Sequence, residues 1–439
     1  MSAVTNQRDI FNRWLVRADI DALYKNNKYS SNKRQDLLHL LRKNLAAGST
    51  EIVTRFNNSG VGIDVLSANS FMMDQLIRII FDTATSYVYP VANRTTSEKI
   101  SVIAVGGYGR SELAPYSDID LMFLHPYKKT PYSEQVVEFI LYMLWDLGLK
   151  VGHSTRSIDD CIRLSKNDPI IQTSLLDARW LWGDQVSFNE FRTQYRREVV
   201  VGNGAKFVEA KLYERDQRHN RVGDSRYVLE PNIKEGKGGL RDLQTLYWLT
   251  KFLYGISDVS ELTKLKVFIP QDIARFQKAM SFLSTVRCHL HYLASRAEER
   301  ITFDVQKIIG ERMNYRNRSP VSGVERFMKD YFLVAKDVGD LTRVLCAVLE
   351  EQQKKKSFFR LPQLIRQTLN TPGLIIDSGR ISVDNENTFN SNPLLLLKIF
   401  AEAQNKNIDI HPEALRLISK SLHLLDEGFC KSREANMVF

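Results

Sequence analysis

Apolar residues recur at helical spacing in two long stretches near the start of the chain, residues 30–47 and 69–92. Within each stretch they stand three or four positions apart, which places them along one face of a helix. Two shorter apolar runs follow at residues 101–105 and 118–124, and their length is typical of strands. The pattern therefore predicts packing helices ahead of a small sheet.

The pattern continues with a further helix and a third strand. Thr130 and the proline after it are typical of a helix start, residues 136–147 are largely apolar, and Gly148 predicts the end of that helix. A third strand is expected over residues 150–157, followed by a short helix over 158–166. This order of elements predicts an α+β fold.

Two acidic residues, Asp118 and Asp120, stand at the start of the second predicted strand. Successive side chains of a strand alternate between its faces, so both carboxylates project on one side, about 7 Å apart along the chain. Neighbouring acids repel each other unless a cation lies between them, and Mg²⁺ is commonly held by one or two carboxylates together with substrate phosphates. We expect Asp118 and Asp120 to be catalytic residues that bind Mg²⁺ or Mn²⁺.

A pair of glycines, Gly106 and Gly107, ends the first predicted strand. Glycine lets backbone N–H groups approach an anion, and residues 108–113 are expected to form a short helix whose N-terminus faces phosphates. Arg110 and Ser117 are expected to be further nucleotide contacts. A Gly-Gly turn or an Asp-x-Asp pair alone is usually only a turn or a solvated strand edge, so it is their combination that indicates a nucleotide-transfer site.

The string that carries both features is Gly-Gly-Tyr-Gly-Arg-Ser-Glu-Leu-Ala-Pro-Tyr-Ser-Asp-Ile-Asp-Leu, residues 106–121. It resembles the signature of the DNA polymerase beta-like nucleotidyltransferases, and more narrowly that of the protein-PII uridylyltransferases of bacterial nitrogen control. The resemblance implies a small mixed sheet with packing helices, followed by a mostly α-helical domain. It also implies Mg²⁺-dependent transfer of UMP from UTP to a tyrosine of a PII signalling protein.

Two other functions stay open at this point. No residue in the sequence reads the base, so a protein adenylyltransferase is one alternative. The other is a non-catalytic remnant that binds PII or nucleotide. Intact Gly-Gly and Asp-x-Asp elements argue for catalysis.

Nucleotidyltransferase cores commonly have a third carboxylate on a later strand, and its identity here is ambiguous. The third predicted strand contains no acid between residues 151 and 156, and Asp177 is the nearest apolar-flanked candidate. Asp177 is either a third catalytic acid or the partner of a neighbouring arginine in an ion pair on a helix. Both interpretations remain open.

A second informative stretch, residues 227–246, combines three glycines with two lysines and an arginine just before a predicted helix. Such a loop favours anions. It resembles the Lys-Glu-Gly-x-Gly-Gly-Leu-Arg-Asp element of the PII uridylyltransferases. From it we expect a loop that binds substrate or phosphate, formed by Lys237, Gly238, Gly239 and Arg241.

The resemblance continues through residues 287–294, 304–306 and 324–329. Cys288, His289 and His291 fall within it, but on a helix these offsets point in different directions. We therefore expect them to pack rather than to bind a metal.

Length adds a domain organisation, because 439 residues are many for one core. We expect an N-terminal helical segment over residues 1–65, a nucleotidyltransferase domain over 66–185 and a helical domain over 186–351. Residues 352–439 are expected to form a hairpin, turning at 377–379, and further helices.

In the resembled family this last region leads into a metal-dependent HD hydrolase domain and then ACT domains that sense small molecules. No His-Asp doublet occurs after residue 351. We therefore expect a chain truncated before the HD domain, which adds UMP without removing it and without responding to glutamine.

Charge and cysteine content limit the remaining classes. The formal net charge is +10, but basic residues are interleaved with acids and no nucleic-acid motif accompanies them, so nucleic acid is not an expected partner. No apolar run reaches the ~18–20 residues of a membrane span, and residues 1–14 lack the apolar core of a signal peptide. Four scattered cysteines suit a reducing compartment. We expect a cytoplasmic protein.

Overall fold

The computed structural model describes residues 4–25, 31–92, 95–127, 129–222, 227–357, 367–369, 371–377, 380–406, 408 and 410–438. The chain divides into two compact units. One comprises Met1–Thr263 with Ile269–Gly339, and the other comprises Lys264–Phe268 with Asp340–Phe439.

A four-stranded mixed sheet organises the first unit. Its strand order is β3-β2-β1-β4, in which β1 runs antiparallel to β2 and β4 while β2 and β3 are parallel. The strands are β1 (Ser101–Ala104), β2 (Ile119–His125), β3 (Val151–Ser157) and β4 (Arg179–Gly183). The expected α+β fold, a small mixed sheet with packing helices, is confirmed.

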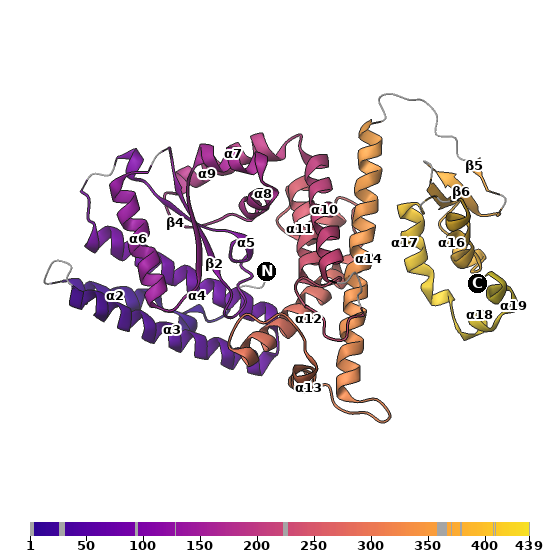
Figure 1. Ribbon diagram of the computed structural model, residues 1–439, viewed down its shortest axis with the longest axis horizontal. Coiled ribbons are helices and arrows are strands. Elements are labelled where there is room, and N and C mark those ends of the chain that lie inside the picture. Colours follow the sequence, from indigo (N-terminus) through magenta and orange to yellow (C-terminus); the bar gives the residue numbers. More distant parts are fainter. Residues whose placement is uncertain are drawn as a thin grey trace. The chain divides into compact units, whose positions relative to one another are not determined.

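Both faces of the sheet are covered by helices, as Figure 1 shows with α7, α8 and α9 above the strands and α3 and α4 below. Side chains of β2 alternate between the two cores: Leu121 and Phe123 pack with α4 and α6, whereas Met122 and Leu124 pack with α7 and α9. These helices are α2 (Arg13–Tyr24), α3 (Ser31–Ser59), α4 (Gly62–Thr83), α6 (Pro131–Asp146), α7 (Ile158–Asn167), α8 (Pro169–Leu176) and α9 (Gln185–Tyr195).

Local sequence signals explain several of these boundaries. The Thr130 side chain accepts a hydrogen bond from the Ser133 N–H at 3.2 Å and Pro131 opens α6, as expected. The two N-terminal helices differ from the prediction in their ends. α3 continues to Ser59, and α4 begins seven positions earlier than predicted, at Gly62, and passes into a π-helical turn at Ala84–Val88.

A helical part of the same unit lies beside the sheet (Figure 1). Its contact with α4 is tight because Gly62 has no side chain: an added Cβ would stand 2.4 Å from the Thr285 nitrogen. The Gly62 N–H also donates to Thr285 Oγ1 at 2.9 Å. The helices are α10 (Gly204–Val222), α11 (Leu240–Tyr254), α12 (Pro270–Ala294) and α13 (Phe303–Arg312). They are followed by α14 (Gly323–Ser357), of which only the part up to Gly339 belongs to this unit.

The second unit is built on a small antiparallel sheet of β5 (Gln367–Thr368), β6 (Leu374–Asp377) and β7 (Arg380–Val383). β6 and β7 pair antiparallel as predicted, with Leu374 opposite Val383, whereas Ser378 and Gly379 of the predicted turn lie outside the described residues. The helices are α15 (Thr388–Ser391), α16 (Leu395–Lys406), α17 (Pro412–Ser421), α18 (Glu427–Lys431) and α19 (Arg433–Val438).

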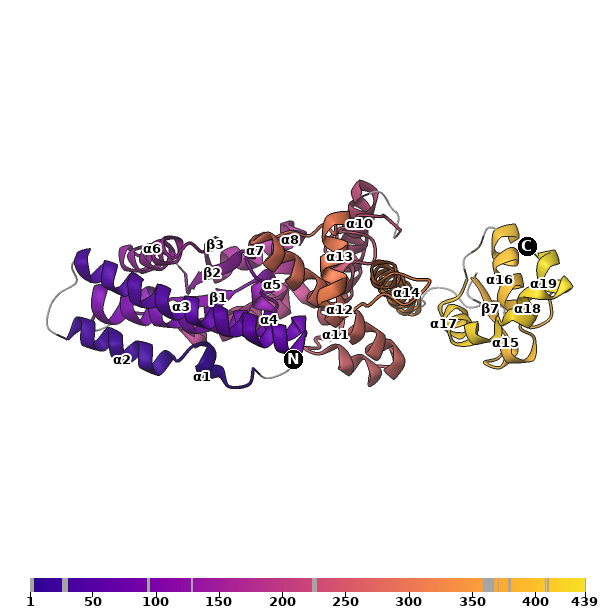
Figure 2. The ribbon, with the colours of Figure 1, turned by 90° about the horizontal axis from the view of Figure 1, so that it is seen from below.

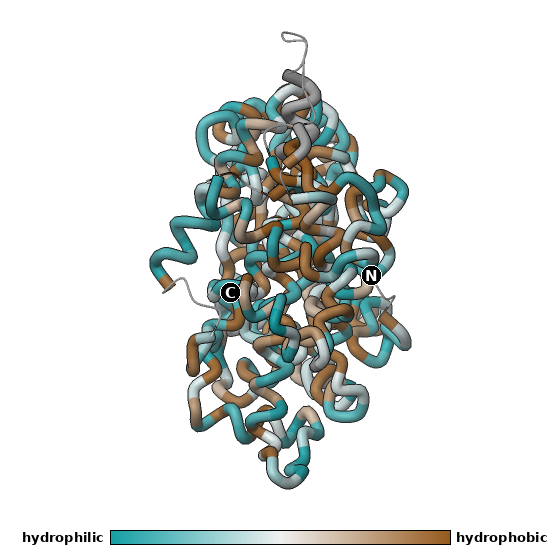
Figure 3. Tube along the Cα trace, turned by 90° about the vertical axis from the view of Figure 1, so that its right-hand side faces the viewer, coloured by the Kyte–Doolittle hydropathy of each residue, from teal (hydrophilic) through white to brown (hydrophobic). Residues whose placement is uncertain are grey.

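Hydrophobic and hydrophilic residues alternate along the helices, as the brown and teal segments of Figure 3 show. This alternation is the helical periodicity from which the elements were predicted. Of the helices that the structure describes, none is long and apolar enough to cross a membrane.

Candidate active site

Asp118 and Asp120 line a cavity of about 680 Å³. Asp118 directly precedes β2 and is exposed, while Asp120 is the second residue of the strand and is half-buried. Within the described residues, no hydrogen bond or ion pair engages either carboxylate. Burial raises the pKa of Asp120, the charge of Asp118 raises it further, and Lys234 opposes both effects. Two unpaired acids that disfavour each other's charge are suited to a divalent cation.

Gly152 creates the space that the Asp120 carboxylate occupies. The parallel register places Gly152 beside Asp120 on the neighbouring strand. A Cβ at position 152 would stand 2.5 Å from Asp120 Oδ1, closer than real side chains approach. Residues 151–156 of this strand contain no acid, and position 152 shows the reason: the strand leaves room for an acid of its neighbour.

The Gly-Gly turn forms a single helical turn, α5 (Gly106–Gly109), directly after β1. The predicted helix over residues 108–113 is therefore wrong in its position. Gly106 has φ +60, a conformation that favours glycine, and its added Cβ would stand 3.2 Å from Asp120 Oδ2. At Gly109 an added Cβ would stand 2.3 Å from the Asp177 carbonyl oxygen. These contacts place the backbone of the turn directly against the acidic strand.

Three residues outside the expected set anchor this turn. The buried Tyr108 hydroxyl donates to Asp74 Oδ1 at 2.7 Å. Arg179 of β4 donates to both Asp74 oxygens, at 2.6 and 3.0 Å, and to the carbonyl oxygens of Tyr108 and Gly109 at 3.2 and 3.3 Å. Sequence reasoning missed Asp74 and Arg179 because each lies in a different element, far from the motif.

Arg110 and Asp177 form a buried ion pair, with Nη1 2.5 Å from Oδ2. Arg110 also donates to Glu112 at 2.8 Å, and Asp177 accepts from Trp248 Nε1 at 2.7 Å and from Lys251 at 3.4 Å. Burial lowers the pKa of Arg110, but the two carboxylates outweigh it and raise the pKa above its usual value.

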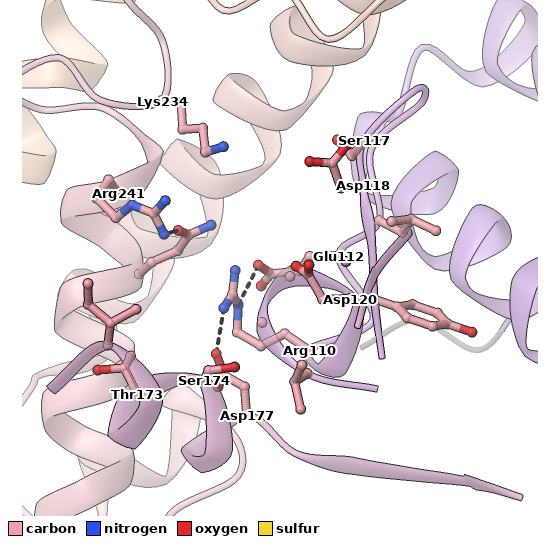
Figure 4. Close-up of a pocket in the computed structure, with 18 of the residues that line it drawn as sticks. Arg110, Glu112, Ser117, Asp118, Asp120, Thr173, Ser174, Asp177, Lys234 and Arg241 are labelled. Carbon is pink, nitrogen blue, oxygen red and sulfur yellow. Dashed lines mark hydrogen bonds and ion pairs between the residues drawn. The ribbon is translucent and has the colours of Figure 1, made fainter. Parts of the chain in front are cut away.

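These contacts favour the ion-pair interpretation of Asp177, although its partner is Arg110 and not an arginine close to it in sequence. Both side chains line the cavity, yet both oxygens of Asp177 and the Nε and Nη1 atoms of Arg110 are already engaged (Figure 4). The described residues contain no group of three or more His, Cys, Asp or Glu side chains placed to hold a metal. Asp177 thus lines the same cavity as Asp118 and Asp120, with its carboxylate paired to Arg110.

The glycine loop before α11 uses its backbone internally. Gly238 has φ +84, its N–H donates to Asp242 at 2.8 Å, and an added Cβ would stand 2.4 Å from the Ala335 carbonyl oxygen. The Gly239 N–H donates to the Gly236 carbonyl at 2.9 Å. Of the four residues expected to bind phosphate here, only Arg241 lines the cavity; Lys237, Gly238 and Gly239 do not.

Basic side chains from the helical part line the same cavity as the carboxylates. Figure 4 shows Lys234 and Arg241 across the pocket from Asp118 and Asp120. Burial and the charge of Arg287 lower the pKa of Lys234. The basic wall consists of Lys211, Arg218, Arg221, Lys234, Arg241 and Arg287. Apart from Arg241, sequence reasoning missed these residues, although Lys234 stands inside the recognised loop motif.

A polar cluster on α12 holds the segment that leads into the acidic strand. Arg287 donates to both Glu299 oxygens and lies 3.5 Å from Ser117 Oγ, and His291 Nδ1 lies 2.5 Å from the Pro115 carbonyl oxygen. Burial would raise the pKa of Glu299, but His291 and Arg287 overcome this and hold that pKa at about 2. Ser117 thus lies in the cavity wall, held from α12.

A mixed sheet with a glycine turn packed against paired, unengaged carboxylates is the arrangement of a nucleotidyltransferase. In agreement, residues 92–180 match the family model of the nucleotidyltransferase domain.

The particular family follows from the rest of the chain. Residues 206–346 match the model described as GlnD PII-uridylyltransferase, and residues 375–439 match the uridylyltransferase GlnD third domain. The chain belongs to the GlnD uridylyltransferase family.

Two relatives illustrate the similarity. The chain is 51% identical over 409 residues to the bifunctional uridylyltransferase/uridylyl-removing enzyme of Rhodospirillum rubrum. The matched region covers 93% of this chain and 43% of that protein. It is 48% identical over 438 residues to the enzyme of the same description from Azospirillum brasilense, covering 99% of this chain and 47% of that protein. The chain therefore spans less than half the length of these relatives.

Proposed function

We propose that this chain transfers UMP from UTP to a tyrosine hydroxyl of a PII signalling protein. The observation that carries the proposal is the pair of unengaged carboxylates, Asp118 and Asp120, facing a wall of basic side chains across one cavity. A nucleoside triphosphate needs both halves of this arrangement, because its phosphates are held by metal-linked carboxylates and by basic groups. The names of the family and of its relatives support uridylate as the group transferred.

Asp118 and Asp120 are the residues that would hold Mg²⁺, with Mn²⁺ as a substitute. Their fit to a hard cation rests on their unshared oxygens and on the raised pKa of Asp120, which marks a charge that the protein itself does not neutralise. A bound divalent ion would neutralise charge on the transferring phosphoryl group and on the leaving group.

The remaining roles fall to groups of the chain itself. Lys234 and Arg241 would neutralise triphosphate oxygens, and Arg241 is oriented for this by contacts with Glu235 at 3.2 Å and Gln244 at 2.9 Å. The backbone at Gly106 and Gly107 would approach the phosphates, where no side chain obstructs them. One of the two acids would take the proton of the attacking hydroxyl.

We place the reaction in the cytoplasm. Cys161 and Cys288 are buried free thiols, and Cys430 is an exposed one, a state that a reducing compartment maintains.

The proposal is tested by incubating the protein with PII, Mg²⁺ and labelled UTP in competition with ATP, CTP and GTP. We expect label on a PII tyrosine from UTP in preference to the other three, and none with the Asp118→Asn/Asp120→Asn double variant. Preference for ATP would identify an adenylyltransferase instead. Transfer by the double variant at the wild-type rate would refute the assignment of the site.

A further inference from the structure

Strand β3 ends the sheet on the side of the cavity. The Ile119 N–H donates to the Lys150 carbonyl at 2.9 Å, which fixes the direction of the backbone groups along the ladder. In a parallel pair, the backbone N–H and C=O groups of every second residue bond to the neighbouring strand. The backbone groups of Gly152 and Ser154 therefore face β2. The backbone groups of the alternate residues point outward, and these residues are Val151, His153 and Thr155. No strand of the described chain pairs with this edge. In Figure 2, β1, β2 and β3 follow one another toward the rim of the molecule.

This free edge passes directly beside the carboxylates. Gly152 is the register partner of Asp120, and Gly152, His153 and Ser154 all line the cavity. Gly152 and His153 are exposed. A segment added to β3 would lie about 4.8 Å from it and about 10 Å from β2. Side chains on one face of that segment would point over Gly152, which has no side chain to obstruct them, toward Asp120.

The other face of the edge carries exposed aromatic side chains. Trp145 of α6 is 43% exposed and its ring lies 5.9 Å from that of His153, while Tyr142 is 54% exposed and lies 5.6 Å from Trp145. α6 packs on the sheet face opposite to Asp120, with Leu121 and Phe123. Alternate side chains of an added segment would therefore meet carboxylates on one face and an aromatic surface on the other.

We propose that the protein substrate binds by strand addition to β3, presenting its acceptor tyrosine on an extended segment. The proposal rests on the proposed function and adds to it the site where the acceptor docks. Main-chain hydrogen bonds to Val151, His153 and Thr155 set the position of the segment, and alternation of its side chains directs the hydroxyl toward Asp120 and the flanking residue onto Trp145. The acceptor segment is the occupant that fits this edge, because Gly152, His153 and Ser154 also line the cavity in which the nucleotide would bind.

Amide hydrogen exchange of the wild-type protein tests this directly. The measurement compares the protein alone with the protein plus Mg²⁺, UTP and a PII protein whose acceptor tyrosine is replaced by phenylalanine. We expect slower exchange in the peptide that contains β3, with β1 and β4 unchanged. Unchanged exchange in β3 would overturn the proposal, and so would protection that grows with enzyme concentration without PII, since that would show pairing between two copies of this chain.

Thr155→Pro provides a second, independent test. Proline removes the outward N–H, which is tolerated on the free side of an edge strand. The matched control, Thr155→Val, keeps both the N–H and the branched side chain. We expect Thr155→Pro to raise the KM for PII at least about tenfold, with the Kd for UTP unchanged and Thr155→Val like wild type.

The two proposals fail in different ways. Absence of UTP binding and of UMP transfer by the wild-type protein would remove the proposed function. Normal UTP binding and transfer, with the same KM for PII in Thr155→Pro and wild type, would overturn only docking on β3.

Discussion

Replacement of Gly152 by alanine should displace the Asp120 carboxylate without a large loss of fold stability. The added methyl would stand 2.5 Å from Asp120 Oδ1, about 1 Å short of ordinary van der Waals contact at 3.4 Å. Among the described residues, the atoms that it meets within 4 Å are those of that carboxyl group, Cγ at 3.7 Å included, and these form the end of a side chain that can rotate. The carboxylate must therefore move while the backbone stays in place.

The magnitude follows from that displacement. A shift of about 1 Å in a reacting group costs about a hundredfold in rate, or about 2.7 kcal/mol of transition-state stabilisation. The free energy of unfolding should change by less than the roughly 1–3 kcal/mol of an overpacked core, because no backbone atom is displaced. Gly152→Ala should thus lower UMP transfer about a hundredfold and raise the Mg²⁺ concentration needed for half-maximal rate.

The assay is single-turnover transfer of labelled UMP to PII over a range of Mg²⁺ concentrations, alongside thermal unfolding. Gly310→Ala is the matched control, because its Cβ would meet Phe327 at an ordinary 3.5 Å and lies in α13, away from the cavity. It should keep wild-type turnover. If Gly152→Ala kept wild-type turnover and metal dependence, the absence of a side chain at position 152 would not determine where the Asp120 carboxylate lies.

Three further predictions concern charged groups of the cavity. Asp120→Asn should abolish transfer yet stabilise the fold at neutral pH. Burial and Asp118 raise the pKa of Asp120, so ionised Asp120 lowers the stability of the folded wild-type protein. The stability gained by the variant should vanish as the pH falls and Asp120 of the wild type takes up a proton. Unfolding midpoints from acidic to neutral pH check this, and a gain that persists at low pH would contradict it. Arg241→Ala should raise the Kd for UTP about tenfold and leave the metal requirement unchanged. Calorimetry of this variant beside Lys237→Ala, whose side chain does not line the cavity, measures the effect. An equal rise of the Kd in both variants would argue against the role of Arg241. Asp177→Ala should lower the free energy of unfolding by about 3 kcal/mol, because it removes a carboxylate partner of the buried Arg110. Denaturant unfolding measures this change. Wild-type stability together with an altered metal requirement would instead identify Asp177 as a metal ligand.

The order of elements and the acidic strand could be predicted from the pattern of residues alone. Periodicity of two or of three to four residues is a local property, so β1, β2, β3 and α6 were predicted close to their observed ends. The projection of Asp118 and Asp120 to one side follows from the same alternation. The unusual backbone conformation of Gly106 is also a local requirement, which only glycine satisfies without cost.

Tertiary structure decided which distant groups meet the carboxylates. Gly152 matters only because β2 and β3 pair in one register, and Lys234 and Arg287 reach the cavity from segments more than a hundred residues after Asp118. Asp177 is drawn into an ion pair by Arg110, whereas Gly238 is buried against Ala335 and not presented to phosphate. Such outcomes depend on which charged groups are buried together and which backbone segments pack closely. Folding brings these segments together from distant parts of the chain, so the residue pattern of a single segment does not reveal them.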